Sequence, residues 1–259
     1  PVTEFNEGTN DPYESIAVTT PDKDGAYGIH LSNAGPGQLW FADNPTISAV
    51  STKSLLQSHG AYGMYFYSNN YMEVLLTNKD HNLAAINIDK VTTIEKDPSL
   101  SNPEVTEAYG LAAVGSSTAV YTLGATLNIS NVKSSLPASA SGYISVCGVY
   151  LNGATLSTEV DAKWHTLGGG GINISNIEAS CENKNAYAYG IYTEGFSSLR
   201  TASDININGV KAGGTNEAYG MYMSGMEVCT NGSNINISSI NPNPEDGPGT
   251  GLYLHGKIF

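Results

Sequence analysis

The chain has 259 residues, of which 40% are hydrophobic and 14% are charged, and its formal net charge is −13. A nucleic-acid binder needs a basic surface to meet phosphate groups, and Arg200 is the single arginine here, so composition excludes that class. The steady recurrence of apolar residues argues against disorder. No apolar run is long enough to span a bilayer, so we expect no membrane insertion of this segment.

The chain contains an internal repeat, which is marked by two motifs. The first motif is Ala-Tyr-Gly followed by an apolar residue, often a second tyrosine, and another apolar residue. Its copies lie at 26–31, 61–66, 108–113, 146–151, 188–193, 218–223 and 250–254. The aligned glycines are Gly28, Gly63, Gly110, Gly148, Gly190, Gly220 and Gly251. This spacing shows that the chain is built from one unit repeated with insertions.

A second motif of the type Ile-Asn-Ile-Ser follows the first. Its copies lie at 86–91, 127–132, 172–177, 205–210 and 235–240, with a weaker echo at 47–50 and a candidate earlier copy at 16–18. A looser apolar segment separates the two motifs at 74–77, 119–122, 199–201 and 228–230. All three segments are short, alternate with period two and are bounded by turn-forming residues, so each predicts a β-strand.

Such short strands cannot bury a face alone, but equivalent strands can stack on one another. The sequence therefore predicts an all-β fold, a parallel β-helix (β-solenoid) of six to seven rungs with three short strands per rung. We expect residues 1–259 to form this single domain, an internal fragment of a longer surface protein. A β-propeller is the alternative, but its blades need four strands and carry marks that are missing here.

Asparagine occupies the position between the apolar residues of the second motif. The equivalent positions are Asn87, Asn128, Asn173, Asn206 and Asn236. Parallel strands in register lie ~4.8 Å apart, so we expect a structural ladder of side-chain amides along the axis.

The first motif predicts a second outward file, two residues after each glycine. It contains Tyr65, Tyr150, Tyr192, Tyr222 and Tyr253, with His30 and Ala112 at the remaining positions. Strict alternation places the aligned glycines on the same outer face, so that a glycine file and a tyrosine file form a shallow groove. By the same parity the tyrosines before each glycine, Tyr27, Tyr62, Tyr109, Tyr189 and Tyr219, should point inward near a corner.

Two interpretations of the outer tyrosines stay open. In one, the rings stack on their neighbours and cover the bare glycine backbone. In the other, they form a binding platform for sugar rings or for the apolar surface of a partner. The connections after the second motif vary in length, and their shared edge is a further candidate for recognition.

The sequence offers little for catalysis or metal binding. The aspartates are dispersed, and the best placed one, Asp89, has Ser130, Ser175, Asn208 and Ser238 as its counterparts, which is no acid/base pair. We expect no enzyme, no cofactor and no metal. The three cysteines, Cys147, Cys181 and Cys229, allow either one disulfide and a free thiol or three buried thiols.

The alternation of AYGIY-type and INIS-type strands resembles repeats in the passenger regions of bacterial type V (autotransporter) proteins. The likeness covers about residues 26–254 and implies a long β-solenoid rod displayed on the bacterial cell surface, outside the cell. It implies adhesion or self-association, with a host or bacterial surface glycan or protein as partner and no nucleic acid. The alternatives are a phage tail-fibre or tailspike segment and a polysaccharide-active β-helix enzyme.

Overall fold

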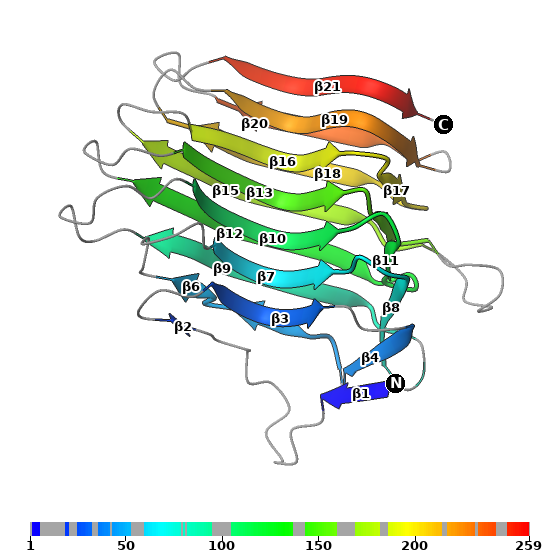
Figure 1. Ribbon diagram of the computed structural model, residues 1–259. Helices are drawn as coiled ribbons and strands as arrows, with labels where there is room; N and C mark the ends of the chain where they lie inside the picture. The colour runs from blue at the N-terminus through cyan, green and yellow to red at the C-terminus, as the bar shows by residue number, and fades with distance from the viewer. Residues whose placement is uncertain are drawn as a thin grey trace.

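The computed structural model describes residues 2–5, 19–20, 25–32, 36–41, 43–52, 60–78, 80, 82–94, 105–136, 143–159, 169–181, 186–213, 217–230, 233–241 and 248–258. Regular structure in these residues consists of strands, which wind upward rung by rung from the N-terminal to the C-terminal end (Figure 1). Every strand pairing is parallel, and the strands fall into three stacks.

The first stack contains the Ala-Tyr-Gly strands. They are β3 (Ala26–Ser32), β7 (Gly60–Tyr67), β10 (Val105–Val114), β13 (Tyr143–Asn152), β16 (Ala186–Glu194), the first half of β19 (Ala218–Cys229) and β21 (Gly249–Ile258). The second stack contains β1 (Val2–Phe5), β4 (Gly37–Phe41), β8 (Met72–Thr77), β11 (Thr118–Tyr121), β14 (Thr155–Ser157), β17 (Ser198–Arg200) and the end of β19.

The third stack contains the Ile-Asn-Ile-Ser strands. They are β2 (Thr19–Thr20), β5 (Thr46–Ser48), β6 (Ser51–Thr52), β9 (Ala85–Ile94), β12 (Thr126–Leu136), β15 (Ile172–Cys181), β18 (Ile205–Ala212) and β20 (Ile235–Ile240). Because β19 runs unbroken through the corner, it joins the first and second stacks into one sheet.

These stacks confirm the predicted parallel β-helix with three strands per rung and exclude the propeller. The weak echo at 47–50 is a true third-stack strand, because Ile47 pairs with Ile88. The candidate copy at 16–18 lies outside the described residues. The strands β4 and β14 were not predicted.

The core lies between the three stacks and repeats from rung to rung. Met64, Leu111, Val149, Ile191 and Met221 follow the aligned glycines and are fully buried, whereas Leu252 at the same position of the last rung is 42% exposed. Their equivalents in the third stack, such as Ile88 and Ile129, are 1% exposed. Each rung therefore contributes apolar side chains to one continuous core along the axis.

The aligned glycines face this core, and the prediction that they lie on the outer face is wrong. A Cβ atom added to Gly63 would lie 2.4 Å from Ile88 Cγ2 and 2.5 Å from the carbonyl oxygen of Gly110. Gly28, Gly110, Gly148, Gly190 and Gly220 meet Ile47, Ile129, Ile174, Ile207 and Ile237 in the same way. Each isoleucine of the third stack thus packs directly on bare backbone of the first, which is why the repeat keeps glycine there.

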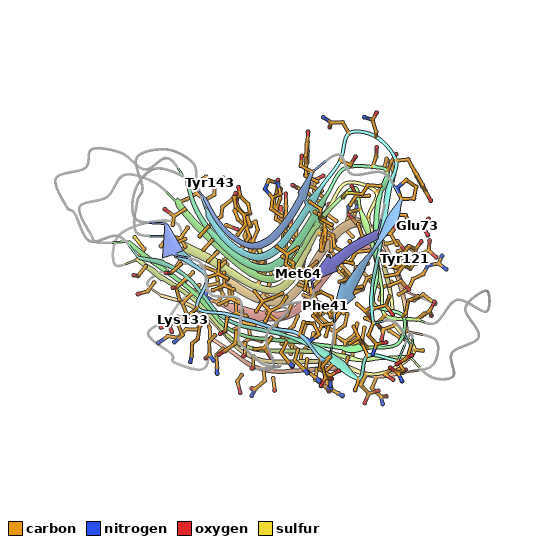
Figure 2. The ribbon with its side chains drawn as sticks, turned by 90° about the horizontal axis from the view of Figure 1, so that it is seen from below. Phe41, Met64, Glu73, Tyr121, Lys133 and Tyr143 are labelled. Carbon is orange, nitrogen blue, oxygen red and sulfur yellow. The ribbon has the colours of Figure 1, made fainter. Side chains whose placement is uncertain are left out.

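Strict alternation fails at this point because two consecutive residues, such as Gly63 and Met64, both face the core. Figure 2 shows the result: the strands of the first stack are bent, and their concave side is turned away from the third stack. The residues on either side of the inward pair are consequently brought together on the concave side.

Candidate functional site

The most distinctive surface is the concave side of the first stack, which we call the tyrosine face. Its first file contains Tyr27, Tyr62, Tyr109, Tyr189 and Tyr219, and its second file contains Tyr65, Tyr150, Tyr192, Tyr222 and Tyr253. The two files contact each other and form an aromatic cluster separate from the core. The prediction that the first file points into the core near a corner is therefore wrong, because the file lies on the concave side beside the bend within the first stack.

Within one rung the two tyrosines meet across the bend. The ring centroids of Tyr62 and Tyr65 are 4.9 Å apart, and those of Tyr189 and Tyr192 are 4.6 Å apart. In the first described rung, His30 takes the second position and stacks on Tyr27 at 4.5 Å. These distances fall in the range in which aromatic pairs attract beyond simple burial.

Along the axis the rings continue from rung to rung. Tyr150 and Tyr192 stack with centroids 5.6 Å apart and planes 10° apart, and Tyr222 and Tyr253 stack at 4.5 Å and 10°. Where Ala112 and Cys147 replace tyrosine, the diagonal pair Tyr109–Tyr150 keeps the aromatic contact at 5.0 Å. The aromatic contacts therefore run from the first to the last Ala-Tyr-Gly strand.

These ring contacts determine which parts of each tyrosine a ligand could reach. In the near-parallel pairs, each tyrosine turns a ring face toward the neighbouring rung, and Tyr62 and Tyr109 are only 6% and 4% exposed. The interior rings thus contact their neighbours in stacked, tilted or edge-on pairs, as the first of the two sequence interpretations expects in part. What they offer to solvent is mainly ring edges and hydroxyl groups.

Two glutamates bind these hydroxyls from the adjoining rung. Tyr62 donates its hydroxyl hydrogen to Glu107, and Tyr150 donates to Glu194. Glu194 also accepts a hydrogen bond from Asn152 Nδ2 at 2.7 Å.

A third glutamate acts within its own rung, where Tyr219 donates its hydroxyl hydrogen to Glu217. Sequence reasoning did not single out any of these three glutamates. The available signal was position: Glu107 and Glu217 each stand two residues before a tyrosine of the first file, and Glu194 stands two residues after one of the second.

The phenols of the face stay protonated over the physiological range. Burial, reinforced by the hydrogen bonds to glutamate, raises the pKa of Tyr62 and of Tyr150 far above the ordinary tyrosine value. Burial likewise raises the pKa of Tyr109. The hydroxyls of Tyr62 and Tyr150 therefore act as hydrogen-bond donors to the carboxylates, whereas that of Tyr109 donates to Ser145 Oγ at 3.2 Å.

Cys147 lies inside the tyrosine face and is fully buried there. Burial raises the pKa of its thiol, and its Sγ lies 4.0 Å from Ser145 Oγ. Cys181 is buried in the core and Cys229 is partly exposed. All three thiols are free, so the alternative with a disulfide is wrong. The alternative of three buried thiols holds for Cys147 and Cys181 but not for Cys229, which is partly exposed.

The five asparagines lie on the outer face of the third stack and form one hydrogen-bonded file. Asn128 Nδ2 donates to Asn87 Oδ1 at 2.9 Å, and Asn173 Nδ2 donates to Asn128 Oδ1 at 2.8 Å. The chain of amides continues through Asn206 at 2.9 Å and Asn236 at 2.8 Å. All five amides therefore point the same way along the axis.

A second file on this face was not predicted. Lys90, Asn131, Asn176, Gly209 and Ser239 all have positive φ, between 55° and 72°. The left-handed conformation favours Asn and Gly, and their recurrence after the Ile-Asn-Ile-Ser segment was the signal that the sequence offered.

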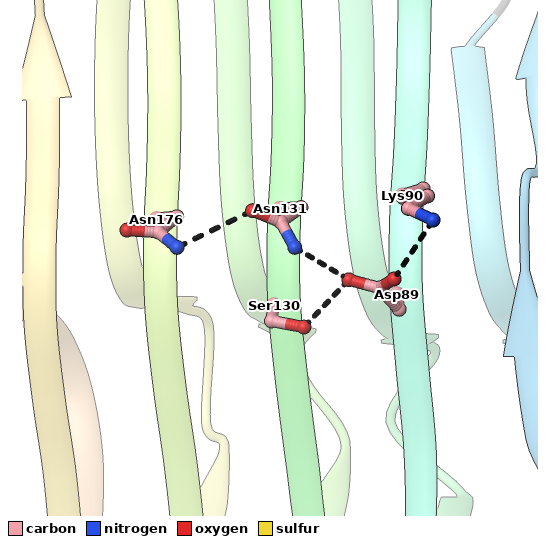
Figure 3. Close-up of polar contacts among 5 residues, drawn as sticks. All are labelled: Asp89, Lys90, Ser130, Asn131 and Asn176. Carbon is pink, nitrogen blue, oxygen red and sulfur yellow. Dashed lines mark hydrogen bonds and ion pairs between the residues drawn. The ribbon is translucent and has the colours of Figure 1, made fainter.

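Asp89 lies beside this second file, next to Lys90 (Figure 3). Its own column contains Ser48 and Ser130 in the adjoining rungs. Asp89 accepts hydrogen bonds from Ser130 Oγ at 2.7 Å and Asn131 Nδ2 at 2.6 Å, and Lys90 Nζ lies 3.9 Å from its Oδ2. Asn131 in turn accepts a hydrogen bond from Asn176 Nδ2 at 3.3 Å. Asp89 thus fastens two rungs together.

Among the described residues, no three His, Cys, Asp or Glu side chains are grouped so that they could hold a metal ion. The same residues include no helix of the length and hydropathy that a membrane span requires. The variable connections after the second motif lie largely outside the described residues, since β9, β12, β15 and β20 extend to Ile94, Leu136, Cys181 and Ile240.

Comparison with known proteins finds no relative: no family model matches this sequence, and no curated protein or solved structure is significantly similar to it.

Proposed function

We propose that this chain is a segment of an extracellular rod, displayed on a bacterial cell surface, that mediates adhesion or self-association. The observation that carries the proposal is the tyrosine face, which continues without a break over all seven Ala-Tyr-Gly strands. A long file of similar aromatic groups makes many weak contacts, and their binding free energies add when the partner is itself repetitive.

Two features of the rod support this role. The amide file on the third stack and the aromatic files on the first both link each rung to the next through side chains, in addition to the backbone pairing. Partner recognition by Tyr and Asn also fits general interface chemistry, since tyrosine supplies large contact area at low entropic cost. The resemblance to autotransporter passengers points to the same role.

The test displays the chain on bacterial cells that neither aggregate nor adhere. We expect these cells to sediment faster or to bind surfaces coated with glycans or host proteins. A double variant, Tyr192→Ser with Tyr222→Ser, should lose this behaviour, whereas Asn173→Ser with Asn206→Ser on the opposite side should keep it.

Both double variants must first show the circular dichroism of the parent, so that misfolding is recognised. Equal loss of adhesion in two folded variants would mean that the tyrosine face has no special part. No adhesion and no aggregation by the parent would overturn the proposed function itself.

A further inference from the structure

The carboxylates of the tyrosine face hold negative charge that the described part of the chain does not neutralise. Glu194 is half-buried, and its donors, Tyr150, Asn152 and the more distant Tyr192, are all uncharged. In the described residues neither Glu194 nor Glu107 forms an ion pair with lysine or arginine. A partly buried anion of this kind gains most from a cationic partner.

The files beside these glutamates are also free of lysine and arginine. Gly60, Glu107, Ser145 and Tyr187 follow one another at the edge of the first tyrosine file. At the edge of the second file Asn152 pairs with Glu194. Among the described residues of the face, the basic side chains are His30 and His255, in the first and last of its strands, so the described part of its middle rungs is acidic.

The ring arrangement restricts how a ligand can lie on this face. In the near-parallel pairs Tyr150–Tyr192 and Tyr222–Tyr253, the neighbouring rung occupies a ring face, so a sugar on these rungs meets mainly ring edges, hydroxyls and the glutamates. The concave shape of the first stack favours an occupant that is narrow and runs along the axis (Figure 2). Parallel strands repeat every ~4.8 Å, close to the length of one pyranose unit in an extended chain.

We propose that the tyrosine face binds an extended linear polysaccharide that carries free amino groups, with about one sugar opposite each rung and its ammonium groups beside Glu107 and Glu194. This inference rests on the proposed adhesive function and names the chemistry of its ligand. Ammonium–carboxylate contacts supply the selectivity, because hydrogen bonds between charged groups are stronger than those between neutral groups.

The experiment measures binding of the full chain to chitosan oligomers, which are linear and carry free amines. Fully acetylated oligomers of the same length and oligogalacturonate, which is acidic, serve as comparison ligands. We expect binding to chitosan, at least tenfold weaker binding to the acetylated chain and none to the acidic chain. Binding to chitosan should weaken with added salt.

Variants locate the site. Glu194→Gln and Glu107→Gln keep the size of the side chain and should each weaken chitosan binding about tenfold, since a hydrogen bond to a charged group contributes ~1.5–3 kcal/mol. The matched control is Glu73→Gln, because Glu73 accepts a hydrogen bond from Tyr71 in a similar pair outside the tyrosine face. This control should bind as the parent does.

Equal affinity for the amine-bearing and acetylated chains, or equal weakening by Glu73→Gln, would overturn the proposal. If the cells do not bind chitosan but their adhesion still depends on Tyr192 and Tyr222, this inference alone is overturned and the adhesive function stands. If adhesion itself is missing, the proposed function fails as well.

Discussion

The hydroxyl group of Tyr62 donates a hydrogen bond to Glu107, which stands 45 residues further along the chain but in the next rung. The stacking of rungs brings these residues together, since Gly60 pairs with Glu107 in the parallel register. The same relationship recurs between Tyr150 and Glu194, 44 residues apart. Side chains on the concave side therefore hold neighbouring rungs together independently of the core.

Replacing an aligned glycine should destabilise the rod strongly. In Gly148→Ala the new Cβ would lie 2.6 Å from both the Gly190 carbonyl oxygen and Ile174 Cγ2, so backbone or core must move. We expect the free energy of unfolding to fall by about 1–3 kcal/mol, the range for overpacked cores. Denaturant unfolding followed by circular dichroism measures the change.

The last glycine of the motif provides the control for this substitution. A Cβ at Gly251 meets nothing closer than Ile237 Cγ2 at 4.0 Å, so Gly251→Ala should change stability little. Similar losses for Gly148→Ala and Gly251→Ala would contradict the packing of isoleucine on bare glycine.

The asparagine file should respond according to position. Asn173 takes part in two amide–amide hydrogen bonds and Asn236 in one, so Asn173→Ala removes two and Asn236→Ala removes one. At ~0.5–1.5 kcal/mol for each hydrogen bond, the first variant should lose about twice as much stability as the second. A double-mutant cycle between Asn128 and Asn173 isolates their own hydrogen bond, and a coupling energy of zero would show that it does not stabilise the fold.

The repeat was predictable because its signature residues have positional reasons that survive in the sequence. Asparagine recurs where amides can bond along the axis, and glycine recurs where an isoleucine needs space. The facing of the tyrosines was not predictable from a period of two, because Gly63 and Met64 both turn inward and shift the alternation by one.

The glutamates of the tyrosine face could not be found from the sequence for a related reason. Glu107 precedes the aligned glycine of its strand, whereas Glu194 follows the aligned glycine of its own. The residue that pairs with Glu107 in the next rung is Ser145, and the one that pairs with Glu194 in the previous rung is Asn152, so the glutamates form no repeating pattern. They become a pair of similar sites only when each is seen to accept the hydrogen of a tyrosine from the preceding rung.

Cys147 should be almost unreactive in the folded protein. It is fully buried within the tyrosine face, and burial raises the pKa of its thiol, which keeps the reactive thiolate scarce. We expect a thiol reagent to modify the partly exposed Cys229 first. Mass spectrometry of proteolytic fragments taken during labelling would establish the order.

Opening the face should change that order. Tyr150 packs against the cluster that contains Cys147, so Tyr150→Ala should increase the labelling rate of Cys147 and leave Cys181, in the core, unchanged. Rapid labelling of Cys147 in the parent chain would show that the tyrosine face does not exclude solvent as described.

Alkaline pH should unfold the rod through its tyrosines. Burial raises the pKa of Tyr109 well above 10, the ordinary tyrosine value, so the folded state keeps a proton that the unfolded state releases. The stability that this phenol contributes is therefore complete below pH ~10 and is lost as the pH rises above it, by about 1.4 kcal/mol per pH unit. Tyr62 and Tyr150, whose pKa values are also raised, act in the same direction.

Unfolding at increasing pH is followed together by phenolate absorbance and circular dichroism. The buried phenols should ionise in the same transition in which the circular dichroism is lost. Tyr109→Phe should reduce the slope of stability against pH. Ionisation of Tyr62, Tyr109 and Tyr150 near pH 10 in a chain that stays folded would contradict the burial of these rings between the rungs.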